Sequence, residues 1–136
     1  MKEVLMISGD IVFKIVDNVE IKVDTINGID PTKLVKRGEI KKFGRESKNL
    51  WSHVEHFNNN NEFELHFLEM LTKLCENPEN VHQLMETYEY VGITIYIRSD
   101  YGQIGWEFSP EMISMIAALG CEVSIDILSG GMVLDN

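Results

Sequence analysis

The sequence predicts an α+β domain in which helices pack on one face of a largely antiparallel sheet. Alternating apolar and polar residues predict strands in the first and last parts of the chain, and amphipathic stretches between them predict helices. Short polar turns join neighbouring strands as hairpins, which favours antiparallel pairing. The expected order of elements is β-α-β-β-α-α-β-β-α-β. A chain of 136 residues without a linker-like stretch is expected to form one domain, residues 1–136.

The N-terminal part combines one clear strand with one ambiguous segment. Residues 11–16 form an apolar run with a single charge, as in a central strand, and residues 1–10 are interpreted as an added edge strand. Residues 17–27 fit two structures equally well. Their apolar residues alternate with charged ones as in a strand, whereas Asp17 and Glu20 form a capping box, as at the start of a helix. The local pattern leaves strand and helix open.

The middle of the chain predicts a strand followed by two helices. Residues 49–57 alternate as a half-buried strand does. Asn61 and Glu64 form a second capping box, and apolar residues follow at the spacing of one helix face. These apolar residues are Phe63, Phe67, Met70, Leu71 and Leu74. A second helix is expected to begin at Pro78, because proline is well tolerated at the first helical position.

The C-terminal part predicts a hairpin, a helix and a last strand. Residues 93–98 and 104–108 alternate on either side of a glycine-containing turn, as the two strands of a hairpin do. Residues 109–120 predict a helix, since they begin with Ser-Pro and end with Gly. Residues 122–127 predict the last strand, and residues 129–136 are interpreted as a flexible tail.

Charge is segregated along the chain. Residues 49–136 carry fourteen acidic and two basic residues, whereas residues 33–48 carry seven basic residues and two Glu. Such segregation indicates a surface with two electrostatic faces and bears on partners rather than on fold. The net charge of −10 disfavours broad affinity for nucleic acids, which rests on Lys and Arg. The basic residues of the segment 33–48 are Lys33, Lys36, Arg37, Lys41, Lys42, Arg45 and Lys48.

No catalytic, cofactor or metal signature stands out in the sequence. The nearest approach to a metal site is the set His53, His56, Glu62 and His66. Zinc accepts such ligands, but the known ligand spacings are missing, so polar residues on a solvated surface explain the set better. The expectation is therefore no metal, no cofactor and no catalytic residue.

Cysteine usage and hydropathy predict a cytoplasmic protein. Cys75 and Cys121 lie among apolar residues, which favours buried thiols in a reducing compartment over a disulfide. No segment has the length and apolar composition of a signal peptide or a membrane span. No membrane is expected among the partners.

Several short segments between residues 28 and 128 carry a resemblance to a known family. They are Gly28-Ile29-Asp30-Pro31-Thr32, Lys36-Arg37-Gly38-Glu39, Trp51, Phe108-Ser109-Pro110-Glu111 and Ile125-Asp126-Ile127-Leu128. In these segments the chain resembles a bacterial family of domains of unknown function, family 4279. The resemblance implies a helix over residues 17–27 and a small bacterial α+β domain with no established activity. It also implies an immunity-type role, because some members look like neighbours of toxin or defence genes.

The expected function is that of a non-catalytic, acidic protein-binding module. Its acidic surface would attract a basic partner protein, and an immunity or antitoxin-like inhibitor is the concrete form of this expectation. The residues expected to steer the partner are Glu62, Glu69, Glu76, Glu79, Glu86 and Glu89. Three alternatives stay open: a nucleic-acid-contacting module that uses residues 33–48, a small-ligand-binding domain, and a homodimer.

Overall fold

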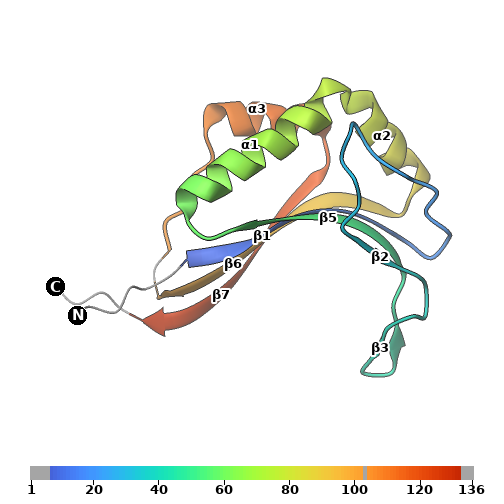
Figure 1. The fold of residues 1–136 in the computed structure, drawn as a ribbon, viewed down its shortest axis with the longest axis horizontal. Helices are drawn as coiled ribbons and strands as arrows, with labels where there is room; N and C mark the ends of the chain where they lie inside the picture. The colour runs from blue at the N-terminus through green and yellow to red at the C-terminus, as the bar shows by residue number, and fades with distance from the viewer. Residues whose placement is uncertain (1–6, 103, 133–136) are drawn as a thin grey trace.

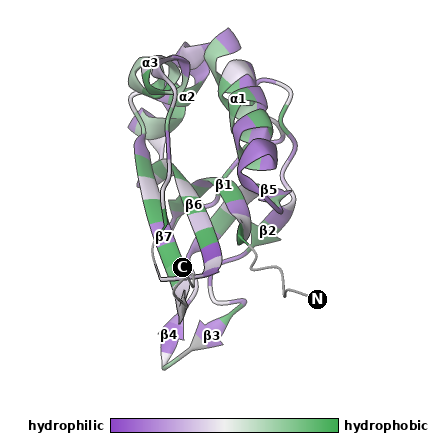
Figure 2. Ribbon diagram, turned by 90° about the vertical axis from the view of Figure 1, so that its left-hand side faces the viewer, coloured by the Kyte–Doolittle hydropathy of each residue, from purple (hydrophilic) through white to green (hydrophobic). Residues whose placement is uncertain are grey.

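The computed structural model describes residues 7–102 and 104–132, and it confirms the α+β class. Three helices lie on one face of a five-stranded sheet, and a small hairpin projects on the other side (Figure 1, Figure 2). The strands of the sheet are β1 (Ile7–Asp17), β2 (Lys33–Val35), β5 (Asn49–Phe57), β6 (Tyr90–Tyr101) and β7 (Glu122–Met132). The hairpin strands are β3 (Lys41–Lys42) and β4 (Arg45–Glu46), and the helices are α1 (Asn60–Glu76), α2 (Pro78–Thr87) and α3 (Pro110–Leu119).

The sheet is largely antiparallel, as predicted. Its strand order is β2-β5-β1-β6-β7, and β1 pairs antiparallel with both β5 and β6. Among the described strands of this sheet, β6 and β7 are the one parallel pair, because α3 crosses between them over the helical face. A parallel pair needs such a crossover. The chain between β6 and β7 therefore passes over the sheet and places α3 on its helical face.

The described N-terminal residues belong to the central strand and not to an edge strand. Residues 7–10 begin β1 and are paired on both sides, with Gly9 opposite Phe57 of β5 and Ile97 of β6. The prediction of an added edge strand is therefore wrong for these residues, because the pairing of β1 continues past its apolar run. Residues 1–6 lie outside the described part of the chain.

The hydrophobic core fills the space between the sheet and the helices. Alternate residues of β1, namely Ile11, Phe13 and Ile15, point into it and are fully buried. The predicted apolar face of α1 is confirmed, since all five of its residues are buried. The buried apolar side chains of the helices and of the inner sheet face join one cluster.

Helix α1 begins two residues earlier than its predicted capping box. Asn59 is the N-cap, and its side chain accepts a hydrogen bond of 2.8 Å from the Glu62 backbone N–H. The Glu62 carboxylate in turn accepts from the Asn58 N–H at 2.6 Å. Four consecutive asparagines offer several equivalent caps, so packing of the apolar face determines which one is used. The predicted proline at the start of α2 is confirmed.

Residues 17–27 do not form the expected helix. After β1 ends, the chain runs in an irregular path along α2, and Ile26 and Ile29 pair across a tight turn. The Lys22 backbone N–H donates to the Tyr88 hydroxyl at 2.9 Å, which ties this path to the end of α2. The Asp17 carboxylate caps a local turn by accepting from the Val19 N–H at 3.1 Å. Aspartate serves such turns and helix caps equally well, so the capping signal was misleading.

Asp17 also sets a pH-dependent contribution to stability. Backbone N–H donors, Val19 first and Glu89 next at 2.9 Å, hold the pKa of its carboxyl below the ordinary value of 3.8. Because the native pKa is the lower one, this stabilisation is complete above the unfolded-state pKa and disappears as the pH falls through the native pKa. We expect Asp17→Asn to lower the melting temperature at neutral pH and to differ little from the wild type in acid.

Thermal melts from neutral pH to about pH 2, well below the ordinary carboxyl pKa, would test this expectation. Asp24→Asn removes the same charge from an exposed site in the same loop and is the matched control. A constant gap between Asp17→Asn and the wild type at all pH values would contradict the linkage argument.

Residues 104–108 do not form the second strand of a hairpin. Strand β6 already has β1 on one edge and β7 on the other, so neither edge is available to a hairpin partner. The segment instead runs back towards α1, and its alternating aromatic residues pack on the core. The predicted C-terminal tail is also partly wrong, because residues 129–132 pair with β6 as the end of β7. Residues 133–136 lie outside the described residues.

The molecule has an acidic helical side and a basic hairpin on the opposite side. Helices α1, α2 and α3 together contain seven Glu and one Lys, whereas segment 33–48 holds the hairpin that projects from the other face of the sheet (Figure 1). None of the helices in the described part of the chain has the length and apolar character needed to cross a membrane.

Candidate functional site

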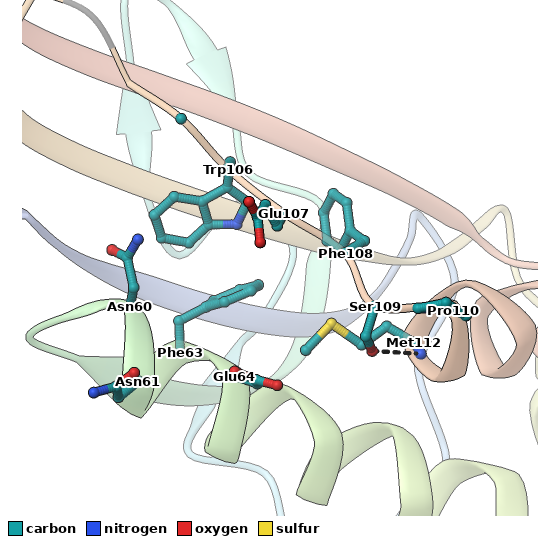
Figure 3. A pocket seen from close by; sticks show the side chains of 11 residues that line it. Asn60, Asn61, Phe63, Glu64, Trp106, Glu107, Phe108, Ser109, Pro110 and Met112 are labelled. Atoms are coloured by element: carbon teal, nitrogen blue, oxygen red, sulfur yellow. Dashed lines mark hydrogen bonds between the residues drawn. The ribbon is translucent and has the colours of Figure 1, made fainter.

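A pocket of about 630 Å³ opens between the first turns of α1 and the segment that precedes α3 (Figure 3). The segment reaches this position because residues 104–108 are excluded from the sheet and cross to the helical side. The lining residues are Asn60, Asn61, Phe63, Glu64, Gly105, Trp106, Glu107, Phe108, Ser109, Pro110 and Met112. The pocket therefore joins two segments that are about forty residues apart in the sequence.

Aromatic rings form one wall of this pocket. The ring centroids of Phe63 and Trp106 lie 4.7 Å apart in an edge-to-face arrangement, and Phe108 lies 6.4 Å from Phe63. Phe57 supports the indole from the sheet at 5.8 Å. The buried Trp106 Nε1 has no hydrogen-bond acceptor among the described residues. Edge-to-face contacts hold the indole in place, so the wall is formed before any ligand arrives.

Carboxylates and amides form the other part of the lining. Glu64 projects from α1 and Glu107 from the facing segment, and both are exposed. Among the described residues no Lys or Arg lines the pocket, so the charge of this lining is negative. Ser109 is engaged elsewhere, because its hydroxyl accepts from the Met112 N–H at 3.2 Å and caps α3. An aromatic wall next to two carboxylates suits a cationic group, which gains from both the ring face and the negative charge.

The six glutamates predicted to steer a partner lie mostly on the helical side. Glu69 and Glu76 are exposed on α1, Glu79 and Glu86 are exposed on α2, and Glu62 is half-buried at the start of α1. Each set repeats every seven residues, the spacing that returns to one face of a helix.

Glu89 differs from the other five glutamates, because it is bound to a basic residue. The Lys48 ammonium donates to its carboxylate at 2.6 Å, which joins the predicted acidic and basic sets at one point. Glu89 therefore offers less free charge to a partner than the five helical glutamates do.

The predicted basic residues surround one end of the sheet on the side away from the helices. Lys33 lies on β2, Lys36 and Arg37 follow that strand, and Lys41 pairs with Glu46 across the hairpin at 3.9 Å. Arg45 begins β4 and is exposed, and Lys42 ends β3. Segment 36–46 projects as a basic arm, whereas Lys33 and Lys48 lie beside the sheet and line a second pocket on this face.

The tip of the hairpin carries an aromatic residue. Phe43 is fully exposed, and it adopts a φ of 53°, the left-handed conformation that allows the two-strand turn. A fully exposed phenylalanine between basic residues has no structural partner within the described chain.

The histidines weighed as metal ligands each have their own partner. His56 Nδ1 lies 2.9 Å from the Asp10 carboxylate, and this hydrogen bond, with a second one to Asn58, raises the pKa of His56. His66 contacts the backbone carbonyl of His56, and His53 contacts that of Asp30. Within residues 7–102 and 104–132, no group of three potential ligands is placed to hold a metal ion.

The cysteine thiols lie in apolar surroundings. Cys121 is buried and Cys75 is half-buried, and burial raises the pKa of both thiols. A raised pKa keeps a thiol protonated, and the protonated form is a poor nucleophile. This placement agrees with the interpretation of both residues as core thiols.

Sequence reasoning missed the pocket and its aromatic wall. Trp106, Glu107 and Phe108 were assigned to a strand because they alternate with smaller or polar residues. One signal against a strand was available in the sequence. Trp106 lies only three residues before the Ser109-Pro110 helix start, so a strand would have to end and turn within those residues. The other half of the pocket, on α1, carried no signal for binding.

Comparisons with known proteins identify a family but no activity. A family model described as a domain of unknown function (DUF4279) matches residues 13–130, which is most of the chain. No curated protein and no solved structure gives a significant match.

Proposed function

This chain belongs to the DUF4279 family, and we propose that it is a non-catalytic module that binds a basic partner protein in the bacterial cytoplasm. An immunity or antitoxin-like inhibitor is the concrete form of the proposal. The single observation that carries it is the pocket at the start of α1, where an aromatic wall and two carboxylates lie on the acidic side of the molecule. A Lys or Arg side chain of the partner is the group that fits this lining.

Long-range attraction is the first step of the proposed encounter. The helices that lead to the pocket carry seven Glu and one Lys, so their field attracts a positively charged surface. Complementary charge raises association rates, and salt weakens the effect because it screens exposed charges. Glu69, Glu76, Glu79 and Glu86 are the exposed members of the predicted steering set that lie on helices.

Anchoring in the pocket is the second step. A guanidinium or ammonium group would lie against the Trp106 ring and between Glu64 and Glu107. Cation–π contacts and charge-assisted hydrogen bonds are both short-ranged. They are therefore expected to slow dissociation and to have little effect on the association rate. The two steps therefore predict separate kinetic effects for the helical glutamates and for the pocket carboxylates.

The experiment captures partners with tagged protein from the cells that make it and then measures binding kinetics with the purified partner. Neutralising Glu69, Glu76, Glu79 and Glu86 to Gln is expected to slow association and to reduce its salt dependence. The double variant Glu64→Gln/Glu107→Gln is expected to weaken binding by about 30-fold through faster dissociation, the size of a hot-spot loss.

A matched control removes the same amount of charge elsewhere. Glu20→Gln, Asp24→Asn, Glu122→Gln and Asp126→Asn neutralise four exposed carboxylates in the loop after β1 and on β7. If this control lowers association as much as the helical variant does, net charge alone explains binding. If neither the helical variant nor the pocket variant changes the kinetics, the proposed function is wrong.

Nucleic acid is the second candidate partner, and one observation favours it. The fully exposed Phe43 lies at the tip of a hairpin flanked by basic residues, which is the make-up of a contact that stacks a base and neutralises phosphates. The same capture experiment distinguishes this candidate. Recovery of nucleic acid that depends on Phe43 and is lost at high salt would favour the hairpin over the pocket.

A further inference from the structure

The face of the sheet that carries no helices holds a second pocket, distinct in place and charge from the first. It has a volume of about 440 Å³ and lies over β1, β2 and β5, with segment 36–48 along one side. We propose that this pocket binds an amphipathic anion, an aliphatic carboxylate of medium chain length. The proposal uses a different face from the proposed function and does not depend on it.

The floor of this pocket is apolar because alternate strand residues face away from the helices. Val12 and Val16 of β1 lie beside Leu50 and Val54 of β5, opposite each other in the register of the two strands. Val35 of β2 completes the floor and is only 8% exposed, although no helix covers this face. The floor therefore offers a hydrocarbon chain a continuous aliphatic surface with partial cover.

The charged residues of the lining are all basic. Lys14, Lys33 and Lys48 line the pocket, and no Asp or Glu in the described part of the chain does. Lys48 is paired with Glu89 at 2.6 Å, but Lys14 and Lys33 have no carboxylate within ion-pair distance among the described residues. Two ammonium groups are thus available to an anion at an apolar site in a protein of net charge −10.

Lys14 is the ammonium best placed at the edge of the floor. Its Nζ lies 5.9 Å from the ring centroids of both Tyr90 and Tyr96, so the two rings flank the cation. Tyr96 lines the pocket together with Lys14. A carboxylate bound there would face a positioned ammonium group, while its chain extends over the valines.

This lining selects among the possible occupants by chemistry. The volume lies within the range of small-molecule sites, and aliphatic side chains with a few polar groups are typical of such sites. A nucleic acid stacks its bases on aromatic rings, whereas this floor is aliphatic, and within the described structure Tyr96 is the single aromatic residue of the lining. An uncharged hydrocarbon would leave the ammonium groups unused. An anion with an aliphatic chain would contact the apolar floor with its chain and the ammonium groups with its charge.

The experiment titrates the full-length protein with decanoate, octanoate and hexanoate and follows valine and isoleucine methyl groups by NMR. We expect shifts at Val12 and Val54, no shift at the buried Ile93 on the helical side, and an affinity that rises by up to about fourfold per methylene group. Decanol is expected to bind more weakly than decanoate, and acetate is expected not to shift these methyl groups.

Charge-removing variants test the role of the lysines without shortening their side chains. Lys14→Met/Lys33→Met is expected to weaken decanoate about tenfold and to leave decanol unchanged. Lys73→Met, on the exposed side of α1, removes one such charge from the other face and is expected to bind like the wild type. Melting temperatures of the variants show whether each one folds.

Several results would overturn the proposal. They are the absence of valine shifts with decanoate, equal binding of decanol and decanoate, and unchanged affinity in the double lysine variant. Shifts at these valines with an oligothymidylate or with anionic lipid vesicles, but not with decanoate, would also overturn it and would assign the face to a nucleic acid or a membrane surface.

Discussion

Replacing Gly9 with alanine is expected to destabilise the protein by about 3 kcal/mol, the upper part of the range for overpacking. Gly9 lies in the central strand, between Phe57 on one neighbour and Ile97 on the other. An added Cβ would overlap the backbone carbonyl oxygen of Tyr96 and lie 2.5 Å from Cζ of Phe57. Strand pairing leaves the backbone little freedom to move, so β1 and β6 would have to separate locally.

Chemical denaturation of Gly9→Ala and of a matched control would measure this effect. Gly105→Ala is the control, because a Cβ there meets no heavy atom within 4 Å. We expect the control to change the free energy of unfolding by no more than about 0.5 kcal/mol. Similar stability of the two variants would show that β1 is not held at the observed distance from β6.

Replacing Phe67 with alanine is expected to lower the free energy of unfolding by about 3–5 kcal/mol, the range for a buried phenylalanine. The side chain is fully buried, and its ring lies 5.3 Å from Phe63 and 6.1 Å from Phe108. It thereby joins α1 to the segment that forms the other wall of the first pocket. Since domains are stable by about 5–15 kcal/mol in total, this loss is a large fraction of the whole.

The control for Phe67→Ala lies on the same helix. Leu65 is 56% exposed, and Leu65→Ala changes neither the core nor the helix propensity by much. We expect its effect to stay within about 0.5 kcal/mol. Denaturation midpoints of the two variants provide the comparison, and equal midpoints would contradict the placement of Phe67 in the core.

The predicted elements that the structure confirms are those with strong local patterns. The apolar spacing on α1 places five residues on one face, and all five are buried. Pro78 begins α2, and Ser109 and Gly120 cap α3 as predicted. These signals act within a few residues of the chain, so the sequence carries them regardless of what surrounds the element.

The wrong predictions concern segments whose structure depends on residues distant in the sequence. Residues 104–108 alternate like a strand, but β7 already occupies the second edge of β6. Asp17 has the signature of a helix cap, but its second carboxylate oxygen accepts from the Glu89 N–H, 72 residues away. The ion pair between Lys48 and Glu89 is equally invisible to a local pattern.

The α+β class, the segregation of charge and the apolar faces of the helices and strands were all predictable from the sequence. These properties follow from the periodicity and composition of the chain, which can be read without knowing which elements are neighbours. Three further features became visible in the folded molecule: Trp106 contacts Phe63, Lys14 and Lys33 line one apolar floor, and the two pockets carry opposite charge. Periodicity specifies which side of an element is buried, but it does not specify what covers that side. The element that covers that side depends on which strand edges and helix faces remain free once the rest of the chain has packed.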